Sequence, residues 1–149
     1  MNQTKNKNQL PEGWRFQKLA EIGKIISGGT PSTSVPEYWN GDISWISPAD
    51  LTGYKKKEIS RGAKSITKEG LKKSSAKLMP KGSVLFSSRA PIGYVAIASN
   101  ELATNQGFKS IIPNDNTDSS YLYYFLKSAK RMAEDVASGT TFKEISLSK

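Results

Sequence analysis

The segment that decides the fold runs through residues 82–98 and reads Gly82-Ser-Val-Leu-Phe-Ser-Ser-Arg-Ala-Pro-Ile-Gly-Tyr-Val-Ala-Ile-Ala98. Residues 84–86 and 94–98 are apolar runs that are too short for a stable isolated helix, so we interpret them as two buried strands. The turn between them carries Ser88 and Arg89 ahead of a Pro/Gly pair. A guanidinium held where a rigid sheet ends is well placed to contact a ligand.

The composition restricts the chemistry of the chain. Its 149 residues suit one domain, and 22 lysines and arginines against 13 acidic residues give a net charge of +9. A polyanion is therefore the expected partner, nucleic acid before an anionic membrane. The absence of cysteine and histidine excludes disulfides, thiolate nucleophiles, the common zinc sites and histidine acid–base catalysis. Without a signal or membrane-spanning segment, we expect a cytoplasmic protein with residues 1–9 as a disordered lead.

Apolar patterns and turn residues predict the other elements. Strands are expected at residues 24–27, 43–46 and 108–112, and Asn40-Gly41 is predicted to form a hairpin turn. Short helical pieces are expected at residues 47–51 and 67–73, the second capped by Thr67. The clearest helix is predicted over residues 119–137, capped by Thr117 or Asp118, with Leu122 and Phe125 on its apolar stripe.

Residues 53–77, called the basic segment below, concentrate the positive charge. They hold nine cations and two acidic residues, so they carry +7 of the net +9. A charge run is usually only a solvated face, but solubility does not require the excess to lie in about a sixth of the chain. The cations are Lys55, Lys56, Lys57, Arg61, Lys64, Lys68, Lys72, Lys73 and Lys77. The helix after Thr67 is expected to bring Lys64, Lys68 and Lys72 near one side of one element.

Two polar stretches are candidates for contact with a nucleic acid. Residues 27–34 combine two glycines with the hydroxyls of Thr30, Ser32 and Ser34, which suit phosphate oxygens, but an ordinary flexible loop is an equal alternative. Asn105 and Gln106 carry amides that can pair with adenine. The alternative, that these amides satisfy loop backbone, is slightly favoured by the residues alone.

Aromatic and acidic residues suggest no catalytic centre. Tyr38, Trp39 and Trp45 could stack on unpaired bases, although such rings more often lie in the core. Asp42 and Asp50 are interpreted as turn residues, because no Glu-x-Lys motif of a nuclease accompanies them. The chain also lacks a P-loop and the glycine-rich cofactor loop of a methyltransferase. We therefore expect no catalytic residues, no metal and no cofactor.

An ordered set of short motifs resembles a known family. The motifs are Leu10-Pro-Glu-Gly-Trp14, Gly28-Gly-Thr-Pro-Ser32, Pro36-Glu-Tyr-Trp39, Gly41-Asp-Ile-Ser-Trp-Ile46, Gly70-Leu71, Ser74-Ser-Ala-Lys77, Ser88-Arg-Ala-Pro-Ile-Gly93, Asn105-Gln-Gly-Phe108 and Gly139-Thr-Thr141. Together they resemble a target recognition domain of the specificity subunit of type I restriction-modification enzymes. The resemblance covers residues 10–149, which we expect to form a single recognition domain.

The resemblance implies a fold, a function and partners. The fold would be α+β, with a twisted, mostly antiparallel β-sheet, a few flanking short helices and one longer C-terminal helix. The domain would bind one half of a split double-stranded DNA sequence without catalysis, and a methylation subunit and, through it, a restriction subunit would be its partners. In the family a spacer helix follows this domain; we expect this chain to lack that helix after residue 149, and self-association would require it.

The expected DNA contacts divide by role. Lysines of the basic segment would hold phosphates, and the candidates for base edges lie at residues 30–34 and 54–57 and at Arg89, Asn105 and Gln106. Motifs shared by a family that reads many different sequences favour scaffold or backbone contacts, so Arg89 and Asn105 would position the domain and residues 55–61 would read the sequence. The candidate residues are Thr30, Ser32, Ser34, Tyr54, Lys55, Lys56, Lys57, Arg61, Lys64, Lys68, Lys72, Ser88, Arg89, Asn105 and Gln106. Two other functions stay open on the sequence alone, a non-specific module for single-stranded DNA or RNA and a protein-interaction domain.

Overall fold

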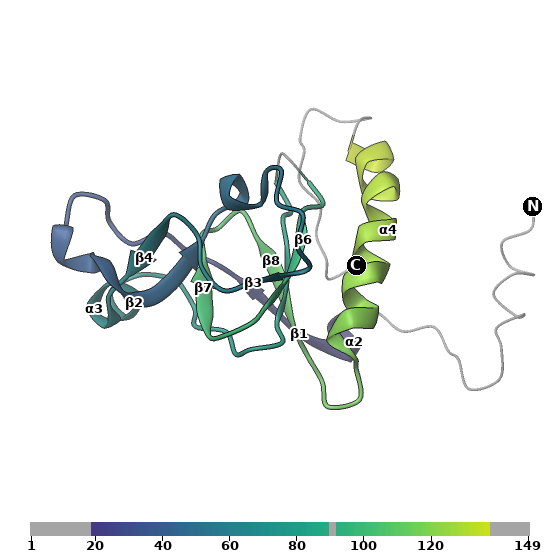
Figure 1. The fold of residues 1–149 in the computed structure, drawn as a ribbon, viewed down its shortest axis with the longest axis horizontal. Coiled ribbons are helices and arrows are strands. Elements are labelled where there is room, and N and C mark those ends of the chain that lie inside the picture. The colour runs from purple at the N-terminus through teal and green to yellow at the C-terminus, as the bar shows by residue number, and fades with distance from the viewer. Residues whose placement is uncertain (1–18, 90–91, 138–149) are drawn as a thin grey trace, which may run out of the picture.

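The fold consists of two β-sheets with helices at their margins (Figure 1). The computed structural model describes residues 19–89 and 92–137. The expected N-terminal lead and the motifs at residues 10–14 and 139–141 lie outside the described residues. Among the described residues, no helix combines the length and apolar character needed to cross a bilayer.

The first sheet has five strands in the order β1-β8-β5-β6-β3. They are β1 (Gly23–Ser27), β8 (Lys109–Pro113), β5 (Val84–Phe86), β6 (Val95–Ala98) and β3 (Glu58–Ile59). Neighbours pair antiparallel except β3 and β6, which are parallel. The two strands predicted within residues 82–98 are confirmed as the paired strands β5 and β6, and those predicted at residues 24–27 and 108–112 are confirmed as β1 and β8.

The second sheet has three strands in the order β4-β2-β7. They are β4 (Lys64–Ile66), β2 (Trp39–Ile46) and β7 (Leu102–Thr104). β2 pairs antiparallel with β4 and parallel with β7. The α+β class with mostly antiparallel pairing is thus confirmed, but the strands form two sheets.

The hairpin turn predicted at Asn40-Gly41 is wrong, because both residues lie inside β2. Asn40 has a φ of 65°, a left-handed conformation that asparagine tolerates better than most residues. The pairing register with β4 shifts between Trp39 and Ile43, so the irregularity is a bulge and not a chain reversal. A Cβ on Gly41 would lie 2.6 Å from the Ile66 carbonyl oxygen, so the bulge needs glycine there.

Strand β5 is apolar throughout because both of its faces are covered. Val84 and Phe86 belong to a core cluster with Leu122 and Leu126 of the C-terminal helix. Leu85, which points to the other face, belongs to a cluster with residues of the second sheet such as Ile46 and Leu102. A third cluster around Trp45 lies beside the short helix that follows β4.

Helix α4 (Ser119–Ala137) confirms the predicted long helix. The side chain of Asp118 caps it, since the Ser120 amide donates to Asp118 Oδ1 at 3.1 Å. The predicted apolar stripe is only partly right: Leu122 is buried, but Phe125 is 45% exposed, and the buried residue beside it is Leu126, which was not predicted on the stripe. Consecutive helical residues are rotated by about 100°, so the face that packs on the sheet leaves Phe125 to one side.

The short helices are α2 (Leu19–Ile22), η1 (Pro36–Tyr38), η2 (Pro48–Leu51) and α3 (Lys68–Lys72). The short helical pieces predicted at residues 47–51 and 67–73 are confirmed as η2 and α3. The predicted cap of α3 is confirmed, because the Gly70 amide donates to Thr67 Oγ1 at 3.0 Å. Figure 1 shows α3 and the second sheet at one end of the molecule and α4 at the other.

Candidate nucleic-acid interface

Among the residues whose exposure the structure describes, the basic segment supplies most of the exposed positive charge, but it does not form one cluster. Its lysines and its arginine are exposed except Lys57, which is half-buried. The segment starts before β3, in the sheet next to α4, and continues through β4 and α3 at the far end of the molecule (Figure 1). The charge is therefore spread along the long dimension of the domain.

Lys57 faces helix α4. Its Nζ donates to Ser120 Oγ at 3.2 Å and lies 5.3 Å from the centroid of the Tyr124 ring. These contacts hold the start of the basic segment against the helix, so part of the interaction capacity of Lys57 is already used within the domain. The exposed neighbours Lys55 and Lys56 remain better candidates for a ligand.

A second group of cations surrounds β4 and α3. Lys68 and Lys72 lie on α3, but Lys64 lies on β4, so the three share a region and not one element. Lys64 Nζ is 5.7 Å from the centroid of the Trp39 ring. The group gathers charge at the end of the molecule that α4 does not cover (Figure 1).

The loop of residues 27–34 is tightly held where its two glycines lie. The Gly29 amide donates to the Thr104 carbonyl at 3.0 Å. A Cβ on Gly28 would lie 2.1 Å from the Asn105 carbonyl oxygen, and one on Gly29 would lie 2.1 Å from Ser75 Oγ. The glycines therefore permit close packing of this part of the loop. The exposed hydroxyls that follow in the chain are attached to a backbone that is held in place.

Two indole groups fasten the same loop. Trp45 Nε1 donates to the Gly29 carbonyl and Trp39 Nε1 donates to the Ser32 carbonyl, both at 3.0 Å. The two rings meet edge to face with centroids 5.1 Å apart. Trp45 is 6% exposed and Trp39 is half-buried, which supports the core role favoured from the sequence. The positions of these tryptophans in the sequence did not indicate that their indoles also anchor the loop.

Thr30 and Gln106 are brought together although they are far apart in the chain. Thr30 Oγ1 donates to Gln106 Oε1 at 2.5 Å, and both residues are exposed. Asn105 instead serves its own turn, because its Oδ1 accepts a hydrogen bond from the Gly107 amide at 2.8 Å. The preference for a structural role is thus supported for Asn105, whereas Gln106 joins Thr30 on an exposed polar surface.

Other candidates differ in how accessible they are. Ser32 and Ser34 are exposed, with their hydroxyl oxygens 2.9 Å apart, and the exposed Tyr54 donates its hydroxyl to the Glu58 carbonyl at 2.5 Å. Arg89 is exposed and lies at the border of the described residues. Ser88 is completely buried beyond the end of β5, where its amide donates to the Gly107 carbonyl at 3.0 Å, so its hydroxyl does not reach the surface and we remove it from the interface.

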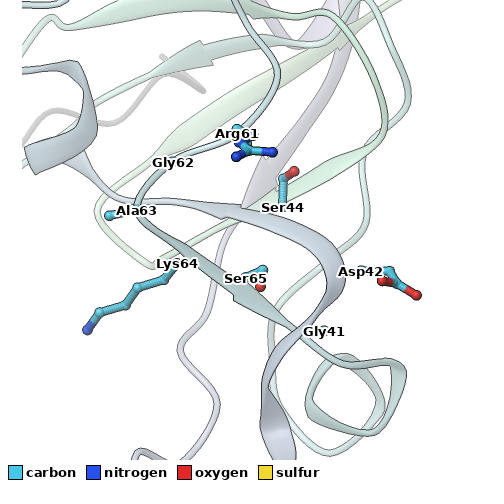
Figure 2. A pocket seen from close by; sticks show the side chains of 8 residues that line it. All are labelled: Gly41, Asp42, Ser44, Arg61, Gly62, Ala63, Lys64 and Ser65. Carbon is cyan, nitrogen blue, oxygen red and sulfur yellow. The ribbon is translucent and has the colours of Figure 1, made fainter.

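A polar pocket of about 400 Å³ lies on β2, β4 and the turn before β4 (Figure 2). The pocket is lined by Gly41, Asp42, Ser44, Arg61, Gly62, Ala63, Lys64 and Ser65. Arg61 was a candidate from the sequence, whereas the pocket itself was missed, because β4 has only three residues and was not predicted as a strand.

Asp50 has the structural role expected of it. Its Oδ2 accepts the Ser47 amide at 2.8 Å and its Oδ1 accepts the Ala63 amide at 3.0 Å. Both oxygens of the carboxylate are thus engaged in joining η2 to the turn before β4. Within the part of the chain that the structure describes, no three His, Cys, Asp or Glu residues are grouped to hold a metal ion.

Comparison with known proteins finds consistent matches. The family model described as the type I restriction modification DNA specificity domain matches residues 11–149. The chain is 50% identical over 140 residues to the MjaIX type I restriction enzyme specificity subunit of Methanocaldococcus jannaschii, covering 92% of this chain and 32% of that protein. It is 34% identical over 134 residues to the HindI specificity subunit of Haemophilus influenzae, covering 89% of this chain and 29% of that protein.

A solved structure shares the fold. It belongs to a study of complex assembly and conformational transition of the type I R-M system, and it superposes with a TM-score of 0.69 at 26% identity. The superposition covers 93% of this chain and 32% of the other. The chain therefore spans about a third of the length of the relatives that it matches.

Proposed function

The chain belongs to the type I restriction modification DNA specificity domain family, and from this premise we propose that it recognises one half of a split double-stranded DNA sequence. In this proposal the domain binds DNA in a sequence-specific manner and leaves methylation and cleavage to other subunits. A methylation subunit would be its direct partner, with a restriction subunit joining through it. Since the relatives are about three times as long, assembly would depend on segments beyond this chain.

The observation that carries the proposal is the exposure of the basic segment. Eight of its nine cations are exposed, in a domain whose remaining residues are nearly neutral. Lysines that neutralise phosphates release counterions, which supplies binding free energy without reading sequence. The group on β4 and α3, which includes Lys64, Lys68 and Lys72, supports a phosphate-binding role at the end of the molecule away from α4.

Sequence reading would come from polar groups with fixed positions. Thr30 and Gln106 are exposed and hydrogen-bonded to each other, and Thr30 directly follows the buried Gly29, whose carbonyl accepts the Trp45 indole. Rigid positioning matters because a base edge is distinguished by the geometry of its hydrogen bonds. Arg89 is retained as a candidate on exposure alone.

Duplex DNA is favoured over single strands because the two tryptophans that could have stacked on unpaired bases are already engaged within the domain. A stacking platform needs exposed ring faces, but Trp45 is buried, and Trp39 is half-buried against Trp45 with Lys64 over its ring. The charge also argues against a role as a purely structural domain, since residues 53–77 carry +7 of the net +9 and expose it along the long dimension of the domain.

The experiment is a fluorescence anisotropy titration of the full chain. The probes are a labelled 30-base-pair duplex of mixed sequence and its single strand, over a series of salt concentrations, and we expect tighter binding to the duplex. Replacing Lys68, Lys72 and Lys73 by alanine should lower the slope of log affinity against log salt by up to about 3, because each phosphate neutralised by a lysine contributes about 0.9 to that slope.

A matched variant separates the two ends of the basic segment. Replacing Lys55 and Lys56 by alanine removes exposed charge near β3 without touching the contacts of Lys57 to α4. An unchanged slope in either variant would remove that end from the interface. Preference for the single strand, or no binding at about 50 mM salt, would refute the proposed duplex recognition.

A further inference from the structure

The pocket on β2 and β4 combines charges, hydroxyls and bare backbone in one place. Ser44 and Ser65 are directly opposite each other in the pairing of β2 with β4, and both line the pocket. Gly41 and Gly62 also line the pocket, and their lack of side chains lets Ile66 and Asp50 pack directly against the two walls. Figure 2 shows Arg61 beside Ser44, with Asp42 at another margin of the pocket.

Arg61 is the cation whose side chain belongs to this pocket. Lys64 pairs with Trp45 across the two strands, and its ammonium lies over the ring of Trp39, so its side chain is on the opposite face from Ser44 and Ser65. Figure 2 agrees, since the Lys64 side chain is directed away from those of Arg61 and Ser44. Arg61 is also the one arginine among the nine cations of the basic segment.

The lining suits a base edge better than a phosphate. A phosphate only accepts hydrogen bonds and is repelled by a carboxylate, yet Asp42 lines this pocket. The major-groove edge of a G·C pair presents two acceptors on guanine and an amino donor on cytosine. An arginine fork can donate to both guanine acceptors, and an aspartate can accept from the cytosine amino group.

The wall that carries Arg61 is held in place from outside the pocket. Asp50 Oδ1 accepts the Ala63 amide at 3.0 Å, and a Cβ on Gly62 would lie 2.3 Å from Asp50 Oδ2. Asp50 is itself anchored by the Ser47 amide at 2.8 Å. On the other strand, the bulge at Asn40 sets the start of the segment that carries Asp42. Bulges often redirect a side chain next to a site.

We propose that this pocket reads a G·C base pair in the major groove, with Arg61 donating to guanine O6 and N7, Asp42 accepting from the cytosine amino group, and Asp50 as a positioning residue. The inference rests on the proposed recognition of duplex DNA and adds which base pair one site selects. It also separates Arg61 from the lysines of the basic segment, which contact phosphates.

The experiment is selection of bound sequences from a randomised duplex library by the full chain, followed by sequencing. The wild type is expected to select guanine strongly at one position that depends on Arg61. Arg61→Lys keeps the charge but removes the fork, and it should reduce the preference at that position by about 5- to 150-fold while leaving the other positions unchanged. Asp42→Asn should relax the same position.

Lys64→Ala is the matched control, because it removes a charge from the neighbouring residue on the opposite face. It should weaken binding to all sequences and leave the selected motif intact. Asp50→Asn should relax the guanine position, and hydrogen exchange should show faster exchange of the Ala63 amide. A structural role of Asp50 without a link to Arg61 would speed that exchange but leave the motif unchanged.

The outcomes distinguish this inference from the function on which it rests. If Arg61→Lys selects the same motif as the wild type, or if the wild type selects guanine at no position, the pocket does not read a G·C pair although duplex recognition stands. If the wild type enriches no sequence and binds no duplex, the proposed function fails first.

Discussion

Replacing Trp45 with phenylalanine tests whether the loop of residues 27–34 is held in place by the core. Trp45 is 6% exposed, and its Nε1 donates to the carbonyl of Gly29, which is itself buried. Phenylalanine keeps an aromatic ring in the cluster but cannot donate, so the Gly29 carbonyl is left without its indole donor. A buried polar group without a partner lowers the free energy of unfolding by about 1–3 kcal/mol. The smaller ring also leaves a cavity, which lowers it further.

The expected loss for Trp45→Phe is therefore about 2 kcal/mol in the free energy of unfolding. For a domain of this size that corresponds to a fall in Tm of about 4–8 °C. Urea unfolding monitored by circular dichroism measures the loss from the midpoint at constant m. Hydrogen exchange of the Gly29 amide, which donates to Thr104, gives a local measure of the same loosening.

Trp39→Phe is the matched comparison. Its Nε1 makes a bond of the same length to the Ser32 carbonyl, but Trp39 is half-buried and Ser32 is exposed, so water can replace the missing donor. We expect a loss of about 0.5–1 kcal/mol. A loss for Trp39→Phe as large as that for Trp45→Phe, or a negligible loss for Trp45→Phe, would refute the reasoning that buried anchoring holds the loop.

Other predictions follow from single contacts. Thr67→Ala should lower the free energy of unfolding by about 1 kcal/mol, since Thr67 Oγ1 caps α3, and Thr67→Ser should restore most of it in the same urea assay. Phe86→Ala should cost about 3–5 kcal/mol because Phe86 is 2% exposed, and a cost as small as that of Phe125→Ala, expected near 0.5 kcal/mol or less, would contradict the packing. Gln106→Ala should keep the unfolding midpoint and weaken duplex affinity; unchanged affinity would exclude Gln106 from the interface.

Local signals predicted the elements whose sequence pattern is continuous. The apolar run of β5, the cap and length of α4 and the Thr67 cap of α3 all depend on neighbouring residues, and the structure confirms them. Strands β3, β4 and β7 have only two or three residues each, and pairing with distant segments makes them strands. Such pairing leaves no periodic pattern to read.

Other differences between the predicted and the observed structure arise at residues whose type is compatible with two local structures. Asn40-Gly41 fits a hairpin turn and a bulge equally well, because both use a left-handed residue, and only the partner strand decides. Phe125 fits an apolar stripe by spacing, but the angle at which α4 lies on the sheet leaves it exposed. Ser88 looked like an exposed loop residue because the sequence does not show that the chain stays buried beyond β5.

The sequence predicted which types of residue form the candidate site, but it did not predict how they are arranged in space. The excess of cations and the polar loops are visible in the sequence, but the basic segment divides between the two ends of the molecule. The approach of Thr30 to Gln106 joins residues 76 positions apart, and the clamp of Asp50 on the turn before β4 joins residues 13 apart. These contacts decide which polar groups are held rigidly.

The central claim, that this domain selects one half of a split DNA sequence, is tested most directly by a domain exchange. This chain would replace one recognition region in the specificity subunit of a complete type I enzyme, and the methylated motif would be read by genome-wide sequencing of modified bases. The account predicts that one half of the modified motif changes while the other half and its methylation persist. An active hybrid enzyme that still modifies the original motif in both halves would contradict it.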